Sequence, residues 1–379
     1  MISKKYDIVV IGGGPAGASA AMSLSEKGYT VIIVEKKSFP REVLCGEFIS
    51  KEVIEFLKIN FLYKDFLKLN PNPIRLFRYI ASNGTDVNSS LNFPSFGIKR
   101  SKFDNLLLSK AGERGAEIIQ PAEVRGIIKK ADGYLITIKV ANEEEIKIFT
   151  KIIIAAYGKQ NILDKISGRN FYRKKSCLNG VKFHIDKSMF RDFNPDEIVM
   201  FDGDDIYLGL NAVDNSTVTL CFLEKRNKLN YSTKERLILL SRQNRKFNAM
   251  LSEDFFDYVS KLQVYGTGNI YFGKRDIVNE GIYYLGDAAG VIAPLVGDGI
   301  GIAVQSAGML SEILFRNNLH IEQSANEYRR EWKKMFLRRM YIAGIIQKGV
   351  LNHSIRNTGI KVISRFPRIL STIIKYTRG

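Results

Sequence analysis

The sequence predicts an α/β fold in which a helix-covered parallel sheet is interrupted by a second lobe built on an antiparallel sheet. Three observations predict this fold. A β-branched apolar run at residues 7–11 is followed by a glycine-rich turn and a helix of small residues. A second glycine-rich turn follows a strand-like run that starts at Tyr283. Between the two turns, residues 171–262 contain further strand-like runs, which indicate a separate lobe.

The first glycine-rich turn has the spacing of a dinucleotide-binding site. Gly12, Gly14 and Gly17 follow the strand in the order G-x-G-x-x-G. Gly12 permits a tight turn, Gly14 leaves room for a pyrophosphate near the backbone, and Gly17 lets the next helix approach the strand. That helix, expected over residues 16–27, would direct its free N–H groups and its positive dipole end toward the phosphates.

An acidic residue marks the ribose end of the same site. Residues 30–34 predict a second buried strand, and Glu35 follows Gly14 by 21 residues. A carboxylate at this strand end can accept hydrogen bonds from a ribose 2′-OH and disfavours a 2′-phosphate, so NADP is not expected in this pocket. The alternative is a strand–turn–helix that binds no nucleotide.

The remaining elements follow from periodicity and turn residues. In the first half we expect a helix from residue 51, strands within 74–96, a helix over 100–115, a meander at 124–128, 134–140 and 145–149, and a separate strand over 152–156. The second lobe is expected to hold strands at 178–185, 198–201, 206–211 and 217–223 and a helix at 233–250. Cys177 and Cys221 lie in strand-like runs and are expected in the core.

The second glycine-rich turn decides between NAD and FAD. It reads Gly286-Asp287-Ala-Ala-Gly, then Pro294, then Gly297-Asp-Gly-Ile-Gly. This pattern resembles the flavin-proximal motif of the class A flavoprotein monooxygenase and geranylgeranyl reductase superfamily. The resemblance implies FAD, with Asp287 bonded to the ribityl chain and the segment from Pro294 running past the isoalloxazine. A helix over about 300–315 would then begin near the flavin's N1–C2 edge, where reduction places negative charge.

Two arginines fit the same resemblance. Arg100 opens the expected helix after Ile98, where the family has an arginine that reaches FAD. Arg41 lies in the loop after Glu35, and a guanidinium suits phosphate oxygens and adenosine edges. Each could instead be an ordinary surface arginine. The Asp-Gly pair of many class A hydroxylases is replaced here by Tyr157-Gly158, which weakens the case for a standard pyridine-nucleotide hydroxylase.

A Cys-Gly pair indicates the geranylgeranyl reductase branch. Cys45 and Gly46 follow the acidic strand, and in that branch the cysteine lies close to the flavin. Cys45 is therefore a catalytic candidate, with a buried inert thiol as the alternative. Tyr207 is a second candidate, because it matches the first position of the branch's Tyr-x-Trp-x-Phe-Pro signature, whose other positions differ here. The tryptophan motif of flavin halogenases is absent, so halogenation is not expected.

The resemblance implies a Rossmann-like FAD-binding fold of the glutathione-reductase and p-hydroxybenzoate-hydroxylase type. We expect an FAD domain at 1–73, 97–170 and 263–315, a substrate domain at 74–96 and 171–262, and a basic helical region at 316–379. The residues expected to hold FAD are Gly12, Gly14, Pro15, Ala16, Gly17, Glu35, Lys36, Arg41, Cys45, Gly46, Arg100, Val124, Ala156, Gly158, Gly286, Asp287, Pro294, Gly297, Gly299 and Ile300.

Composition excludes several classes. The chain has 379 residues and 45% hydrophobic residues, which is ordinary for a globular protein. No uncharged apolar run approaches the about 18 residues of a membrane span, and the first strand begins too early for a signal peptide. Three cysteines argue against a disulfide framework and fit a reducing cytoplasm. The three histidines, His184, His320 and His353, show no metal-ligand spacing, so no metal is expected.

The last stretch carries most of the net charge. Residues 316–379 hold 14 Lys and Arg against 3 Glu, a net +11 of the chain's +18. Basic pairs alternate with apolar residues at helical spacing over 329–341 and again over 360–376. Such helices can lie peripherally on an anionic membrane or dock an acidic carrier protein. The alternative is a cap packed on the FAD lobe; nucleic acid is not expected, because no recognition module accompanies the charge.

These observations predict an FAD-dependent oxidoreductase acting on a hydrophobic, free or carrier-bound substrate. Hydride would pass between flavin N5 and a C=C bond, with NAD(P)H as a transient reductant because no second nucleotide domain is visible. The alternative is a monooxygenase that hydroxylates an aromatic or other electron-rich substrate through a flavin hydroperoxide. A flavin-binding protein without turnover is a third hypothesis.

Overall fold

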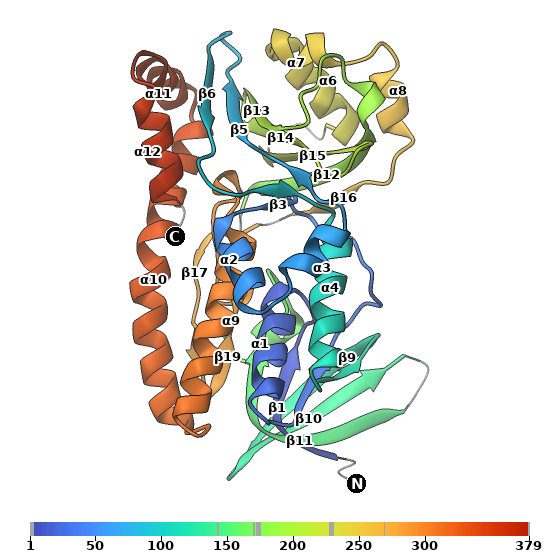
Figure 1. Ribbon diagram of the computed structural model, residues 1–379, viewed down its shortest axis with the longest axis vertical. Helices are drawn as coiled ribbons and strands as arrows, with labels where there is room; N and C mark the ends of the chain where they lie inside the picture. Colours follow the sequence, from blue (N-terminus) through green and yellow to red (C-terminus); the bar gives the residue numbers. More distant parts are fainter. Residues whose placement is uncertain are drawn as a thin grey trace.

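Two sheets organise the molecule, one around the dinucleotide motifs and one above it (Figure 1). The computed structural model describes residues 4–141, 144–169, 171, 176–226, 231–268 and 270–377. The mixed α/β fold class expected from the sequence is confirmed.

The first sheet has a parallel core with the strand order of a doubly wound nucleotide-binding fold. In spatial order the strands are β8 (Glu117–Ile119), β2 (Val31–Val34), β1 (Lys4–Ile11), β11 (Glu145–Ala155) and β19 (Ile282–Tyr284), with β18 (Val278–Asn279) antiparallel at the edge. The core strands are buried on both sides, as their β-branched composition predicts.

Helices cover this sheet and bring the glycine motifs to its carboxyl edge. The helices around it are α1 (Pro15–Glu26), α2 (Lys51–Ile59), α3 (Tyr63–Lys68), α4 (Arg100–Glu113), α5 (Ile162–Ile166) and α9 (Gly299–Arg316). α1 packs against both α4 and α9. Gly17 permits the close approach of α1, because a Cβ atom there would lie 1.9 Å from the Gly12 carbonyl oxygen.

One sequence-based expectation about this sheet is wrong. The first two strands of the meander are β9 (Ala122–Lys130) and β10 (Gly133–Val140). The third strand of the meander and the strand of the main sheet, which we expected to be separate, form the single strand β11. β11 is continuous, pairing antiparallel with β10 through Thr150 and parallel with β1 through Ala155. The Thr150 side chain is buried and donates to the Asp7 carbonyl oxygen, so the polar residue does not break the strand.

The second sheet forms the upper lobe. In spatial order it contains β16 (Tyr265–Thr267), β12 (Leu178–Asp186), β15 (Thr217–Lys225), β14 (Ile206–Ala212), β13 (Glu197–Gly203), β5 (Leu76–Ile80) and β6 (Asp86–Ser90). β16 lies beyond the limit of 262 expected for this lobe. Two small sheets lie outside the large ones: β3 (Phe48–Ile49), β7 (Phe96–Gly97) and β4 (Asn72–Pro73) form one, and β17 (Gly273–Lys274) and β20 (Gly290–Val291) form the other.

The two faces of the second sheet have different neighbours. Its outer face packs against α6 (Thr233–Gln243), α7 (Arg245–Met250) and α8 (Phe255–Ser260) through a phenylalanine-rich core. Its inner face presents Tyr79, Met200 and Tyr207 to a second apolar cluster. The single helix expected at 233–250 is broken at Asn244, whose side chain accepts from the Phe247 N–H and caps α7.

The basic C-terminal residues form helices packed along both lobes (Figure 1). α10 (Ile321–Val350) packs on α9, while α11 (His353–Arg365) and α12 (Arg368–Tyr376) contact β6. Pro367 separates α11 from α12, consistent with its inability to continue a helical hydrogen-bond ladder. Within the described ranges, we found no helix whose length and apolarity would let it cross a bilayer.

Candidate active site

One cavity of 1510 Å³ lies between the two sheets and receives both glycine-rich segments. The segments meet directly: a Cβ atom on Gly286 would lie 3.2 Å from the Cβ of Ala16. Every residue expected to hold FAD lines the cavity except Gly17, which lies behind the turn between α1 and β1. The cavity exceeds the roughly 300–1,000 Å³ of sites for drug-sized ligands, so it has room for a large cofactor and a second molecule.

The N-terminus of α1 faces this cavity without a side-chain cap. Gly14 is the N-cap residue and Pro15 is the first helical residue, so the free N–H groups of the first turn are left for a ligand. Gly12 has a φ of +106°, and a Cβ atom there would lie 2.6 Å from the Ala156 carbonyl oxygen. The glycine spacing is thus required sterically, at Gly12 by the backbone of Ala156 and at Gly17 by that of Gly12.

Glu35 lies buried at the end of β2, beside this turn. Its carboxylate accepts from the Gly13 N–H at 2.7 Å and from the Lys37 N–H at 2.9 Å. The Arg41 Nε atom lies 3.6 Å from the same carboxylate. The backbone therefore fixes an acceptor at the position where the sequence predicts ribose recognition. Lys36 points to Glu123 instead, with which it forms an ion pair.

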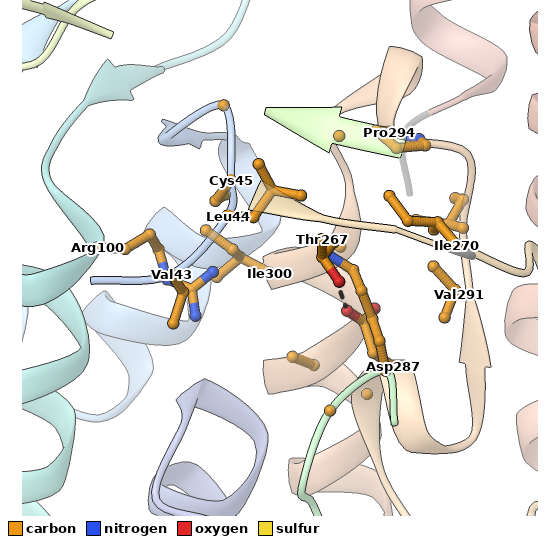
Figure 2. Close-up of a pocket in the computed structure, with 18 of the residues that line it drawn as sticks. Val43, Leu44, Cys45, Arg100, Thr267, Ile270, Asp287, Val291, Pro294 and Ile300 are labelled. Atoms are coloured by element: carbon orange, nitrogen blue, oxygen red, sulfur yellow. Dashed lines mark ion pairs between the residues drawn. The ribbon is translucent and has the colours of Figure 1, made fainter. Parts of the chain in front are cut away.

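The second glycine motif forms the opposite wall. η3 (Gly286–Ala288) follows β19, and η4 (Pro294–Val296) leads into α9 through Gly297 in the left-handed region. Figure 2 shows Asp287, Val291 and Pro294 across the pocket from Leu44 and Cys45. Asp287 forms a long ion pair of 4.0 Å with Lys159, and a carboxylate paired so loosely can also accept from a hydroxyl of a bound ligand.

Cys45 lies in the cavity wall beside two donors. The Glu47 N–H donates to its sulfur at 3.3 Å, and the Arg100 guanidinium is also in hydrogen-bonding contact with it. Arg100 is held by a bidentate ion pair with Asp104 at 2.6 and 2.8 Å. Burial lowers the pKa of Arg100, but the charge of Asp104 and the contact with Cys45 outweigh burial and raise it. Arg100 is therefore a fixed cation at the thiol.

A buried charge cluster behind Cys45 is a feature that the sequence interpretation missed. Glu47 is fully buried and accepts from the Arg100 N–H, Lys182 Nζ, His184 Nε2 and Thr219 Oγ1 at 2.8, 3.0, 2.6 and 2.5 Å. Burial raises the pKa of Glu47, but the His184 hydrogen bond and the Lys182 charge outweigh it and lower the pKa to about 2. The cluster joins the Cys45 loop to the second sheet.

The same cluster contains groups that could bind a metal ion. Glu42, Glu47 and His184 offer ligand atoms within 4.8 Å of one another. Lys182 Nζ, however, contacts Glu42 at 2.7 Å and Glu47 at 3.0 Å, and so already supplies the positive charge. We assign the cluster to positioning and propose no metal there. A lysine inside the apolar run Val181-Lys182-Phe183 was the sequence signal for it.

The part of the cavity toward the second sheet is apolar. Tyr207 is buried there, and its hydroxyl donates to Gln347 Oε1 of α10 at 3.2 Å. Cys221 also lines the cavity, and burial raises the pKa of its thiol to about 12. Cys177 is exposed, so the expectation that it lies in the core is wrong, because it precedes β12 rather than lying within it.

The match to a known protein family identifies the cofactor. A family model described as an FAD binding domain matches residues 5–317. The chain belongs to this FAD-binding family. The protein is thus an FAD-dependent oxidoreductase, as the two glycine motifs predicted. FAD fits the residues present, because α1 offers uncapped N–H groups, Gly14 leaves the backbone open, and Glu35 and Asp287 place acceptors on opposite walls.

Relatives of this FAD-binding chain include two archaeal enzymes. The digeranylgeranylglycerophospholipid reductase of Methanococcus vannielii is 23% identical over 352 residues, covering 88% of this chain and 83% of the relative. That of Thermoplasma volcanium is 26% identical over 348 residues, covering 88% and 85%. The resemblance to the geranylgeranyl reductase branch, expected from Cys45-Gly46, is therefore confirmed.

Solved structures share the fold. A geranylgeranyl bacteriochlorophyll reductase-like protein from Thermoplasma acidophilum has a TM-score of 0.76 and 20% identity, covering 95% of this chain and 92% of that chain. A flavin-dependent brominase has a TM-score of 0.78 and 18% identity, covering 98% and 93%. Because the same fold serves reductases and halogenating enzymes, the reaction has to be argued from the site.

Proposed function

We propose that this protein is an FAD-dependent reductase that saturates a C=C bond in a polyprenyl-type lipid. The observation that carries the proposal is the apolar part of the FAD cavity. Two tyrosines face it, and both hydroxyls are engaged: Tyr79 donates to Asp202 at 2.6 Å and Tyr207 to Gln347 at 3.2 Å. A hydrocarbon chain fits this lining, because a polar substrate would lose its hydration there without gaining partners. The names of the archaeal relatives support the same substrate class.

The residues of this chain bind and orient the cofactor. Flavin N5, when FAD is bound, supplies or receives the hydride. The α1 N-terminus would hold the pyrophosphate, Glu35 the ribose hydroxyls and Asp287 the ribityl chain. The N-terminus of α9 at Gly299 and Ile300 would place a positive dipole end beside the isoalloxazine. A reduced nicotinamide would serve as a transient donor from solution.

Saturating a C=C bond requires a hydride on one carbon and a proton on the other. We assign the proton to Cys45 Sγ, which lines the cavity. The Glu47 N–H and the Arg100 guanidinium can stabilise the thiolate that remains after the transfer. A proton from solvent then restores the thiol. Tyr207 is a weaker donor, because burial raises the pKa of its hydroxyl well above the ordinary value.

A monooxygenase is the second candidate, and the residue at position 157 weakens it. Tyr157 stands where many class A hydroxylases have the acid of their Asp-Gly pair, and its hydroxyl donates to Asp164 in the cavity wall. Burial, followed by the charge of Asp164, raises the pKa of Tyr157. The carboxylate of that pair, which helps such enzymes handle nicotinamide, is thus replaced by a neutral phenol.

Product analysis tests these functions. Photoreduced holoenzyme is mixed with geranylgeranyl diphosphate or a geranylgeranylated glycerophospholipid, with and without air. Our proposal predicts a product heavier by two hydrogens, formed equally well without O₂, together with reoxidation of the flavin. A product that gains oxygen only in air would show a monooxygenase instead. A reduced flavin that no substrate reoxidises would indicate a protein without turnover.

We also propose that the outer face of α11 and α12 rests on an anionic membrane. Val362 and Phe366 are 44% and 61% exposed. Lys361, Arg365 and Arg368 lie between and beside them and are exposed as well. Apolar side chains interleaved with lysine and arginine are typical of helices at a lipid interface, and anionic lipid complements this charge. A substrate dissolved in the bilayer would then be presented to the lobe that receives it.

Charge reversal tests this surface. Lys361→Glu with Arg365→Glu should lower binding to phosphatidylglycerol vesicles roughly tenfold or more, since each basic residue near the surface contributes about 1 kcal/mol. Lys129→Glu with Lys130→Glu, on exposed β9, is the matched control and should bind normally. Unchanged co-sedimentation of the α11 double variant would contradict membrane docking; binding to an acidic carrier protein would then be tested.

A further inference from the structure

The cavity wall nearest the C-terminus comes from helices outside the matched FAD-binding region. Val350 of α10, Ile360 and Ile363 of α11, and Leu370 and Ile374 of α12 line the cavity. Figure 1 shows α11 and α12 beside β6, at the end of the molecule away from α1 and β1. A segment outside the FAD-binding region therefore closes one end of the cavity.

The second sheet forms the facing wall of the same space. Phe77 and Tyr79 of β5 and Met200 of β13 line the cavity and share one apolar cluster with Ile360 and Leu370. Ile360 and Leu370 are each 7% exposed, so their side chains are committed to this interior. The helices and the sheet together build a hydrocarbon-lined end to the cavity.

Buried ion pairs hold these helices in place. Arg356 of α11 lies 3.4 Å from Asp202 and donates to the Gly203 carbonyl oxygen at 2.7 Å. Arg339 of α10 donates to Asp298, in the loop before α9, at 2.9 Å. The first pair anchors the segment to the second sheet and the other anchors it to the FAD lobe. The end wall is therefore fixed rather than loosely apposed, and a fixed wall can discriminate substrates by length.

Resting on the proposed function, we propose that α11 and α12 are the end wall of the substrate cavity and limit the length of the hydrocarbon chain. Ile360 and Leu370 are the specificity-determining residues. A larger side chain at either position shortens the available space, and a smaller one lengthens it. The ligand class is a linear or branched hydrocarbon chain whose reactive end lies toward the flavin and whose far end meets these two side chains.

Chain-length profiles of the holoenzyme test the proposal. Leu370→Phe and Ile360→Phe should lower kcat/KM for a twenty-carbon prenyl substrate relative to a ten-carbon one by roughly tenfold or more, since excluding two or three methylene groups from an apolar site costs at least that factor. Leu370→Ala should shift the profile toward longer chains. Equal effects on both chain lengths would overturn the proposal.

A variant on the exposed side of α10, in the same helical region, is the matched control. Ile345 is 54% exposed and does not line the cavity, so Ile345→Phe adds the same kind of bulk outside it. The control should keep the parent chain-length profile. A shift of the profile in Ile345→Phe equal to that in Leu370→Phe would show a general disturbance of the helices and would also overturn the proposal.

Binding separates this inference from the proposed reaction. The oxidised holoenzyme is titrated with phytol, a twenty-carbon alcohol, and citronellol, a ten-carbon alcohol, following the flavin absorption. The parent should bind phytol more tightly, and both phenylalanine variants should lose that preference. If the preference is lost but no prenyl substrate is ever reduced, the reaction is wrong and the end wall stands. If the parent shows no preference, or the variants keep it, the end wall is wrong whatever the reaction.

Discussion

At the scale of residues, the candidate site depends on charges that backbone and side-chain donors hold in place. Glu35, Asp287, Arg41 and Arg100 could be assigned from the sequence, because each stands at a fixed offset from a glycine motif or a helix start. Glu47 could not, because its partners Lys182 and Thr219 are brought to it only by the second sheet. The sequence therefore predicted the residues that line the cavity better than the charged cluster behind them.

Glu35→Ala is expected to weaken FAD binding. The variant removes the proposed ribose acceptor and leaves the Gly13 and Lys37 N–H groups without a partner carboxylate. Hydrogen bonds to charged groups contribute roughly 1.5–3 kcal/mol, so the Kd for FAD should rise roughly tenfold to a hundredfold. Fluorescence titration of the apoprotein with FAD measures this Kd. The control is Glu117→Ala, which removes the partly exposed ion pair with Lys4. An unchanged Kd would show that Glu35 does not contribute to FAD binding.

Cys45→Ser should slow substrate reduction while FAD stays bound. The hydroxyl is a poorer proton donor than the thiol, so substrate-dependent reoxidation of the flavin should slow tenfold or more, in the range of roughly 10²–10⁴ ascribed to general acid catalysis. The exposed Cys177→Ser is the control and should behave as the parent. Identical reoxidation rates of the parent and Cys45→Ser in stopped-flow experiments would show that Cys45 only packs in the cavity wall.

The lowered pKa of Glu47 predicts that the free energy of unfolding depends on pH. Its folded-state pKa of about 2 lies below the ordinary 4.5, so the stabilisation is fully present above pH 4.5 and is lost as the pH falls toward 2. The shift corresponds to about 3 kcal/mol. The gap in unfolding free energy between the parent and Glu47→Gln should therefore shrink below pH 4.5. A gap that stays constant from pH 5 to 3 would contradict the charged cluster; exposed Glu253→Gln should show no gap.

At the scale of elements, the sequence predicted the βαβ unit, the meander and most strands of the second sheet. It failed where tertiary contacts override local patterns. Thr150 and Lys151 suggested a gap in β11, yet pairing with β10 on one side and β1 on the other keeps the strand continuous. The sequence placed Asn244 inside a single helix. In the structure its side chain caps α7 and donates to the Ile80 carbonyl oxygen, and α6 ends before it.

The attachment of α11 gives a prediction at this scale. Arg356 and Asp202 are 1% and 0% exposed, and removing one partner of a buried ion pair typically costs about 3–5 kcal/mol. Arg356→Ala should therefore lower the free energy of unfolding by about that amount in urea denaturation. Arg365→Ala, exposed on the same helix, should change it by no more than about 0.5 kcal/mol. Equal effects of the two variants would mean that α11 is not anchored through Arg356.

At the scale of the whole molecule, two short segments far apart in the sequence become neighbours. β1 with α1 and β19 with η3 reach the same edge of the sheet, and Gly286 then contacts Ala16. The second sheet and the C-terminal helices close the space above that edge. The sequence predicted both segments and their lobe, but not that α11 and α12 would contribute to the cavity, since amphipathic helices alone do not specify what they cover.

The absorption spectrum of the purified, folded chain tests the central claim, that one FAD lies between Gly12–Glu35 and Gly286–Asp287. After incubation with excess FAD and gel filtration, the protein should keep a flavin spectrum corresponding to one FAD per chain, and a double variant Glu35→Ala with Asp287→Ala should lose it. A folded parent protein that leaves the column without flavin absorption would contradict the account.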